Sequence, residues 1–283
     1  MSTILHLIYA AIIGLIQGIS EWLPISSKTQ IIVSSTYLLK LTFQQAYTFG
    51  LFMEIGTIIA AVVYFRKDLI EIIQVLLGSK NKLQRKLLIY IVIVTLITAI
   101  IAVPIYLVAD SIKGIALGIP MLIVGLILIA DAVLIRYSRK RREKGMNSRK
   151  LEDLTLRDCA LVGIVQGIAA LPGVSRSGVT TSAMLLMNVE PDEAFRLSFL
   201  AGIFASIGAF GLTLIVSKSN VAVAVNGIGL AGIFVAIIVS TIVSLFLIDF
   251  LIKVAGKSKI IYLITALGII AMASGLLYLT FGL

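Results

Sequence analysis

Two short polar segments stand out because each lies inside an otherwise apolar stretch of the chain. They carry a carboxylate, two cationic side chains and several hydroxyl groups: Glu21, Ser26, Ser27, Lys28, Ser175, Arg176, Ser177 and Thr180. Guanidinium and ammonium groups bind phosphate oxygens, and a carboxylate can take a proton or ligate a cation. The residue types therefore indicate chemistry on an anion such as phosphate, if the fold brings both segments together.

Proline and glycine break any helix in both segments. Pro24 precedes the first serine pair, and Pro172-Gly173 precedes Ser175. Helices that restart after these breaks would aim backbone N–H groups into a shared cavity, which suits an anion. A single buried ion pair between Glu21 and Arg176 is the simplest alternative. It leaves Lys28 and the hydroxyl groups unexplained.

The composition identifies the solvent in which these segments work. Of the 283 residues, 59% are hydrophobic and 13% are charged, and the mean hydropathy is +1.10. A soluble chain has about 45–50% apolar and about 25% charged residues. The single cysteine, Cys159, excludes a disulfide-stapled secreted domain. The chain is therefore predicted to be an integral membrane protein, and neither a cytosolic enzyme nor a disordered protein.

Apolar stretches long enough to cross a bilayer, which is about 30 Å thick, define the predicted spans. Six are uninterrupted: Ala46–Phe65, Leu87–Val108, Ile115–Ile135, Ala194–Ile215, Val221–Ile248 and Ile260–Leu283. Two more, Thr3–Ser35 and Leu156–Asn188, contain the broken polar segments near their middles. Irregular backbone at membrane depth is tolerated where it lines a polar cavity, so each is predicted to be a re-entrant hairpin.

The basic residues support this topology. Eighteen of the 24 lie in three stretches, Arg66–Lys86, Arg136–Arg157 and Lys253–Lys259. Lys- and Arg-rich loops mark the cytoplasmic side, and re-entrant hairpins place all three stretches on that side. Both termini and the first hairpin then lie on the outer side. The net charge of +10 thus reflects topology, with headgroup binding as a secondary role and no nucleic-acid partner.

An internal repeat links the two hairpins. Gly14-Leu-Ile-Gln17-Gly-Ile19 recurs as Gly163-Ile-Val-Gln166-Gly-Ile168, and Leu-Pro and serines follow in both copies. An odd number of spans separates the copies, which gives them opposite orientations. The predicted fold is an all-α membrane domain of residues 1–283 with two inverted repeats, each a re-entrant hairpin plus three transmembrane helices. The first repeat covers 1–136, a basic cytoplasmic loop covers 137–157, and the second repeat covers 158–283.

The two motifs, Gly18-Ile-Ser-Glu21-Trp-Leu-Pro24-Ile-Ser-Ser27 and Leu171-Pro-Gly-Val-Ser-Arg176-Ser-Gly178, resemble those of the undecaprenyl-diphosphate phosphatase (bacitracin-resistance) family. The resemblance covers nearly the whole chain. It implies a hydrolase of the cell membrane that removes the terminal phosphate of a polyprenyl diphosphate and so recycles the lipid carrier for cell-surface glycans. It also implies a divalent cation, Mg or Ca. Glu21, Ser27, Ser175 and Arg176 match positions that the family uses in catalysis or diphosphate binding.

The chain departs from the family pattern at three positions. Gln17 stands where the family has the first glutamate of a Glu-x-x-x-Glu pair, and Gln30 stands where it has a histidine. Lys28 replaces a small hydroxyl residue. Glutamine donates hydrogen bonds but neither takes a proton nor attacks phosphorus, so this chain is expected to be a divergent member.

A hypothesis that accommodates these departures assigns catalysis to Glu21, Ser27 and Arg176. Ser27 is the nucleophile or orients an attacking water, and Glu21 is the base or a metal ligand together with Glu54. Gln17, Gln30 and Glu54 support the site, and Glu54 compensates for the missing carboxylate. The residues expected to bind the diphosphate are Lys28, Ser26, Ser175, Ser177, Gly178 and Thr180.

A transporter is the alternative from another functional class. A cavity with Arg, Lys and hydroxyl groups but without the histidine could move a polyprenyl phosphate across the membrane without cleaving it. Inverted repeats occur in transporters as well, so the architecture leaves both functions open. The expected partners are the lipid substrate and membrane lipids, and the sequence leaves a homodimer open.

Overall fold

The computed structural model describes residues 3–111, 118–142, 148–255 and 260–281, and these residues form helices and no strand. The only strand-like pairing among them is an isolated bridge between Arg149 and Val189. The helices are α1 (Thr3–Ser20), α2 (Ser27–Leu39), α3 (Phe43–Tyr64), α4 (Arg66–Leu76), α5 (Lys82–Ser111), α6 (Gly118–Arg142), η1 (Leu151–Asp153), α7 (Leu156–Ile168), α8 (Arg176–Leu186), α9 (Pro191–Val216), α10 (Lys218–Ala255) and α11 (Ile260–Phe281).

Five of the described helices are long and apolar enough to cross a membrane: α3, α5, α9, α10 and α11. The chain is therefore a multi-pass membrane protein. Residues 118–135 of the remaining predicted span, Ile115–Ile135, lie in α6, whose described apolar part is Met121–Ala130, and residues 115–117 lie outside the described residues. Because α6 continues to Arg142, the predicted boundary between residues 136 and 137 falls inside a helix.

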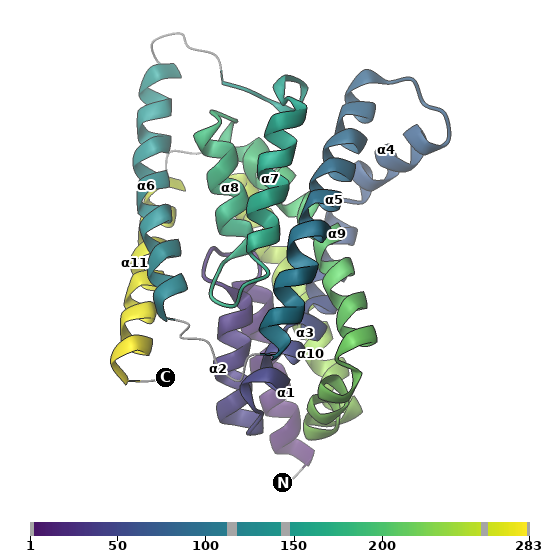
Figure 1. Ribbon diagram of the computed structural model, residues 1–283, viewed down its shortest axis with the longest axis vertical. Helices are drawn as coiled ribbons and strands as arrows, with labels where there is room; N and C mark the ends of the chain where they lie inside the picture. Colours follow the sequence, from purple (N-terminus) through teal and green to yellow (C-terminus); the bar gives the residue numbers. More distant parts are fainter. Residues whose placement is uncertain (1–2, 112–117, 143–147, 256–259, 282–283) are drawn as a thin grey trace.

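The two broken segments form pairs of short helices. Residues 21–26 separate α1 from α2, and residues 169–175 separate α7 from α8. Ser26 and Gly173 have positive φ angles of 58° and 91°, so the chain turns sharply just before each second helix. Figure 1 shows α1 and α2 at one end of the bundle and α7 and α8 at the other, with both linkers at mid-height.

The first helix of each pair packs on a long helix from the other half of the chain. Helix α1 lies along α10, and α7 lies along α5. A Cβ atom at Gly18 would lie 2.9 Å from the Ser240 carbonyl oxygen, and one at Gly167 would lie 2.6 Å from Ile101 Cβ. Only glycine permits such close approach, so the repeated Gly-x-x-x-Gly spacing serves helix packing.

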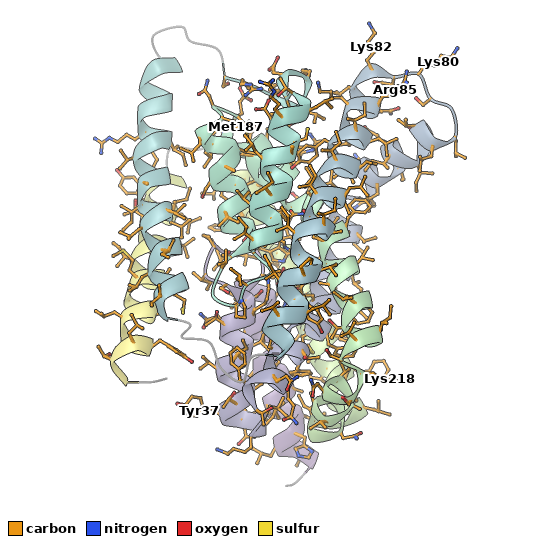
Figure 2. The ribbon with its side chains drawn as sticks, in the orientation of Figure 1. Tyr37, Lys80, Lys82, Arg85, Met187 and Lys218 are labelled. Atoms are coloured by element: carbon orange, nitrogen blue, oxygen red, sulfur yellow. The ribbon has the colours of Figure 1, made fainter. Side chains whose placement is uncertain are left out.

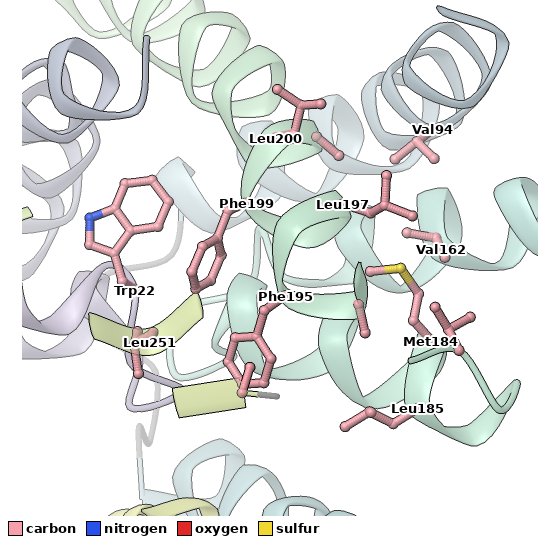
Figure 3. Packing of buried hydrophobic residues seen from close by; sticks show 14 of the residues in the cluster. Trp22, Val94, Val162, Met184, Leu185, Phe195, Leu197, Phe199, Leu200 and Leu251 are labelled. Atoms are coloured by element: carbon pink, nitrogen blue, oxygen red, sulfur yellow. The ribbon is translucent and has the colours of Figure 1, made fainter. Parts of the chain in front are cut away.

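Aromatic side chains connect the first hairpin to α9. Trp22 packs edge-to-face on Phe199 with ring centroids 5.0 Å apart, and Phe199 makes a similar contact with Phe195 at 5.7 Å (Figure 3). Trp22 is only 4% exposed. It is therefore a core residue beside the linker and not an anchor at the bilayer surface.

Capping fixes the start of α7. The Thr155 hydroxyl accepts a hydrogen bond from the Asp158 backbone N–H, and the Asp158 carboxylate accepts one from the Thr155 N–H at 2.7 Å. Arg149 donates to the same carboxylate at 2.5 Å. Burial alone would raise the pKa of Asp158, but the hydrogen bonds from Arg149 and Thr155 outweigh it and lower the pKa to about 2.

Basic residues collect at the end of the bundle that carries α7 and α8. Lys80, Lys82 and Arg85 lie there, whereas Lys218 lies at the opposite end (Figure 2). Helix α4 projects from the bundle near the same basic end (Figure 1). Parts of the two other basic stretches, residues 143–147 and 256–259, lie outside the described residues.

Candidate active site

Arg176 connects the two hairpins. It is the first residue of α8, and its guanidinium forms an ion pair with Glu21 in the linker between α1 and α2. Its Nη1 atom lies 3.6 Å from an Oε2 atom of Glu54 on α3. The same Nη1 donates to the Gly202 carbonyl at 3.0 Å and to the Ser206 hydroxyl at 2.6 Å. One guanidinium thus holds two carboxylates and anchors both hairpins to α3 and α9.

Glu21 is the centre of a local hydrogen-bond network. Its Oε2 atom accepts a bond from the Ser27 hydroxyl at 2.7 Å and another from Gln17 Nε2 at 2.9 Å. Ser27 is the first residue of α2, so the break in the helix brings it back against Glu21. A hydroxyl that donates to a carboxylate is placed to lose its proton when it attacks an electrophile.

Glu54 and Lys28 complete a group of four buried charges. Glu54 is 2% exposed and accepts a hydrogen bond from the Ser206 hydroxyl at 2.5 Å. Lys28 is 7% exposed, and its attraction to Glu54 and Glu21 opposes its repulsion by Arg176. The formal charges of Glu21, Glu54, Lys28 and Arg176 cancel, as buried charges require if they are to remain ionised.

A cavity of about 150 Å³ begins at this charge cluster. Lys28, Glu54 and Arg176 form part of its wall. Much of the remaining wall is small or apolar, and α5 and α9 supply many of these residues, among them Ala99, Ala102, Val103, Ala205, Gly208, Ala209 and Leu212. Charge on one part of the wall and apolar side chains on another suit an amphipathic anion.

Ser27 and Glu21 contact this cavity only indirectly. Neither is among the described residues that line it, and the Arg176 guanidinium, which does line it, binds Glu21. An anion in the cavity therefore meets Arg176 and Lys28 first. Access to Ser27 requires that Arg176 exchange its carboxylate partner for the anion.

Most of the hydroxyl groups predicted to bind diphosphate are engaged in local hydrogen bonds. Ser175 caps α8 by accepting from the Gly178 N–H at 3.3 Å, and Ser177 donates to the Leu23 carbonyl at 3.4 Å. Thr180 donates to the Arg176 carbonyl at 2.8 Å, and its hydroxyl is also hydrogen-bonded to that of Ser198.

Ser26 also lies within the hairpin, where its hydroxyl accepts a hydrogen bond from Thr29 at 3.0 Å. Ser26, Ser175, Ser177, Gly178 and Thr180 are absent from the described residues that line the cavity. Of the predicted diphosphate-binding set, Lys28 is the residue that the structure places on the cavity wall.

The two glutamines that replace family residues lie differently. Gln17 contacts Glu21 directly, so the position remains part of the site but acts as a hydrogen-bond donor. Gln30 is half-buried and donates to the Ile25 carbonyl at 3.4 Å, a weak local bond within the hairpin. Gln17 Oε1 has no hydrogen-bond partner among the described residues.

Several polar groups of the site and cavity were not predicted from the sequence. Ser206 and Gly202 lie in the apolar span α9, where nothing in the sequence distinguishes them from neighbouring small residues. Thr98 lies in α5 and accepts a hydrogen bond from Gln166 at 3.1 Å. For Gln166 there was a signal, because it occupies the position of Gln17 in the internal repeat.

A few oxygen atoms near Arg176 have the chemistry to ligate a divalent cation. The described residues contain no group of three or more His, Cys, Asp or Glu side chains that could hold a metal. Glu21 and Glu54 nevertheless converge on Arg176, and the unpartnered Gln17 oxygen lies beside Glu21. Mg²⁺ is often held by one or two carboxylates plus substrate phosphates, so these oxygens fit a cation that binds with its substrate.

Comparison with known proteins finds a matching family and similar relatives over most of the chain. Residues 10–273 match the family described as bacitracin resistance protein BacA. An undecaprenyl-diphosphatase of Saccharolobus solfataricus is 46% identical over 273 residues, which are 96% of each chain. Another from Sulfurisphaera tokodaii is 44% identical over 275 residues, 96% of this chain and 98% of the relative. A third, from Pyrobaculum aerophilum, is 37% identical over 274 residues, which are 96% of this chain and 98% of the relative.

Proposed function

The chain belongs to the bacitracin resistance protein BacA family, and we propose that it hydrolyses undecaprenyl diphosphate, or a closely similar polyprenyl diphosphate, to the monophosphate and inorganic phosphate. Membership confirms the resemblance seen in the two motifs. The observation that carries the proposal is that Arg176 joins both hairpins at Glu21, which itself accepts the hydrogen bond that the Ser27 hydroxyl donates. Cation, acid–base group and nucleophile therefore meet at one point.

Substrate binding begins with an exchange of partners at Arg176. The diphosphate enters the cavity beside Lys28 and Arg176, and its oxygens compete with the carboxylates for the guanidinium fork. The prenyl chain lies along the apolar wall between α5 and α9. Once Arg176 binds phosphate, Glu21 retains its bonds from Ser27 and Gln17 and no longer has the guanidinium to itself.

The chemical step uses this released carboxylate. Ser27 Oγ attacks the terminal phosphorus while its proton passes to Glu21 Oε2, and the bond to the bridging oxygen breaks. Glu21 passes this proton to the lipid monophosphate as it leaves. The regenerated Glu21 then takes a proton from a water molecule that attacks the phosphorus, and it returns that proton to Ser27 Oγ as inorganic phosphate is released. Arg176 and Lys28 stabilise the charge on the phosphoryl oxygens, which is the main catalytic requirement of phosphoryl transfer.

A divalent cation held by Glu21 or Glu54 together with the diphosphate would neutralise further charge in the transition state. Glu54 also keeps the cluster neutral before substrate arrives. In this chain the proton-accepting function of the family histidine falls to Glu21. Gln30 cannot accept a proton, and among the described residues its carboxamide donates to the Ile25 carbonyl.

The finer architecture belongs to the same proposal. Two inverted repeats account for the reciprocal packing of α1 on α10 and of α7 on α5, with paired glycines at matching positions. Each repeat would contribute one re-entrant hairpin and three spans: α3, α5 and α6 in the first, α9, α10 and α11 in the second. The basic ends near Lys80 and Lys82 would face the cytoplasm, with both termini and the first hairpin on the outer side.

Phosphate release by the purified protein tests the function. We expect the unmodified protein to release inorganic phosphate from undecaprenyl diphosphate and Ser27→Ala to lose at least about 1,000-fold in kcat, the scale of a lost nucleophile. Ser34→Ala is the matched control, since Ser34 lies on the same helix and bonds only to backbone carbonyls there. Movement of intact lipid phosphate across liposomes without phosphate release would instead establish the transporter, which the names of the relatives do not favour.

A further inference from the structure

The cavity wall has a second polar part, formed by residues of α5 and α7, which do not contribute to the charge cluster. Its members are Thr95, Thr98 and Gln166, and all three line the cavity. They have no role in the reaction described above. Their arrangement raises the question of what they bind.

Gln166 is held in place at one end of its carboxamide and left without a partner at the other. Its Nε2 atom donates to the Thr98 hydroxyl at 3.1 Å, and that hydroxyl donates to the Gly163 carbonyl at 3.2 Å. The side chain is 2% exposed, yet its Oε1 atom has no hydrogen-bond partner among the described residues. The Thr95 hydroxyl is also buried, and it too has no hydrogen-bond partner among the described residues.

Buried polar atoms without partners are costly, so two of them on one cavity wall indicate a polar ligand. The carboxamide can present either its oxygen or its nitrogen atom to that ligand. If it turns by 180°, Nε2 points into the cavity as a donor, and the Thr98 hydroxyl donates to Oε1 in place of the Gly163 carbonyl. With Thr95, the wall then presents two neutral donors in addition to the cations Lys28 and Arg176.

The sequence around Gln166 favours an anion as the ligand. In the first repeat, Gln17 is followed four residues later by Glu21, whereas Gln166 is followed at the same spacing by Ala170. The Ala170 carbonyl accepts a hydrogen bond from the Tyr47 hydroxyl at 3.0 Å. No carboxylate therefore accompanies Gln166 at the position corresponding to Glu21, and an anion beside the amide meets no repulsion from there.

We propose that Gln166 and Thr95 form a second, uncharged phosphate-binding subsite, held in position by Thr98. One phosphoryl group of the ligand binds at Arg176 and Lys28, and the other accepts hydrogen bonds from the Gln166 amide and the Thr95 hydroxyl. This inference rests on the proposed function for the identity of the ligand. The chemistry it requires, a phosphate oxygen, belongs equally to the lipid phosphate and to the released inorganic phosphate.

Binding and turnover measurements on the full chain in detergent test the subsite. Gln166→Met keeps the side-chain volume and removes the amide, and Thr95→Val removes the hydroxyl. The matched controls are Gln84→Met near the exposed start of α5, and Thr265→Val on α11, which bonds only within its own helix. The measurements are the KM and kcat for the diphosphate, and the dissociation constants of inorganic phosphate and of a polyprenyl monophosphate determined in the Ser27→Ala background.

We expect each test variant to weaken at least one of these dissociation constants about tenfold, the size of a lost hydrogen bond to a charged group, with a larger effect on KM than on kcat. Weaker binding of inorganic phosphate alone assigns the subsite to the leaving phosphate, and weaker binding of the monophosphate alone assigns it to the lipid phosphate. Gln166→Glu adds a negative charge without changing the shape of the side chain, and it should weaken phosphate binding at least as much as Gln166→Met does.

Dissociation constants and KM within about twofold of the parent in Gln166→Glu and Thr95→Val would overturn the subsite while leaving the hydrolase intact. If Gln166→Met does not fold, Thr95→Val and Gln166→Glu provide the same comparison. A parent protein that releases no phosphate but binds inorganic phosphate in a Gln166-dependent manner would refute the proposed function and retain the subsite.

Discussion

Removing Arg176 should destabilise the protein through the charges that it leaves behind. Arg176→Met preserves much of the side-chain volume but leaves Glu21 and Glu54, which are 6% and 2% exposed, without their guanidinium. Breaking a buried ion pair by removing one partner costs about 3–5 kcal/mol. We expect the free energy of unfolding to fall by about that amount.

A second substitution separates this electrostatic cost from lost packing. In Glu21→Gln/Arg176→Met, one negative and one positive charge disappear together, and Lys28 and Glu54 remain to balance each other. The double variant should therefore recover about 2 kcal/mol relative to Arg176→Met alone, because a neutral amide at position 21 needs no cation. Both variants should be inactive, because the single variant cannot bind phosphate through Arg176 and the double variant also cannot deprotonate Ser27.

Equilibrium unfolding in mixed detergent micelles, followed by tryptophan fluorescence, measures both effects. Trp22, the single tryptophan, lies beside Glu21 in the linker and reports on this region. Arg196→Met is the control, because Arg196 pairs with Asp68 and Glu193 while a third of its side chain is exposed. This substitution should lower the free energy of unfolding by about 1 kcal/mol or less. A double variant less stable than Arg176→Met would refute the charge-balance reasoning.

Three further predictions concern parts of the fold that hold the site. Gly167→Ala should cost about 1–3 kcal/mol in thermal unfolding, because its Cβ would lie 2.6 Å from Ile101 Cβ, whereas Gly208→Ala, with no atom within 4 Å, should be neutral. Lys40→Gly should stabilise by about 0.5–1 kcal/mol, since Lys40 ends α2 with a φ of 56° that glycine adopts without strain. Asp158→Asn should cost about 1 kcal/mol at pH 7, and because the pKa of Asp158 is lowered to about 2, the difference from the parent should shrink as pH falls from about 4 toward 2.

Each of these predictions has a clear contrary result. Equal melting temperatures for the two glycine variants would show that the α5–α7 contact is not tight. A gain from Lys40→Ala as large as that from Lys40→Gly would exclude backbone strain as the cause. A pH-independent difference for Asp158→Asn would mean that the carboxylate charge does not stabilise the start of α7.

Local signals in the sequence were sufficient for the long apolar helices and for the principal site residues. Proline and glycine marked the breaks at Pro24 and Gly173, and ionisable residues in apolar segments marked Glu21 and Arg176, which the structure joins. Helix α4 was not predicted, because the basic residues of Arg66–Lys86 indicated a loop and its apolar residues Ile70, Ile73 and Leu76 are too few to form a span; all three are exposed.

The hydroxyl groups show why site membership is harder to predict than site location. Ser175, Ser177 and Thr180 have the residue type expected of phosphate ligands, but serine and threonine also bond readily to nearby backbone, and here they do so. Ser206 gave no signal, because its role depends on how α9 packs against Arg176, a tertiary contact. Sequence pattern thus located the cluster, and packing decided which polar groups face the cavity.

The most direct test of the account follows the terminal phosphate itself. Undecaprenyl diphosphate labelled with ³²P in the terminal phosphate would be incubated with the purified protein, with Ser27→Ala and with the Ser34→Ala control. We predict labelled inorganic phosphate from the parent and the control, and label retained in the lipid with Ser27→Ala. Equal release by Ser27→Ala and the parent would contradict the role of Ser27 at this centre, and no release by any of the three would contradict hydrolysis.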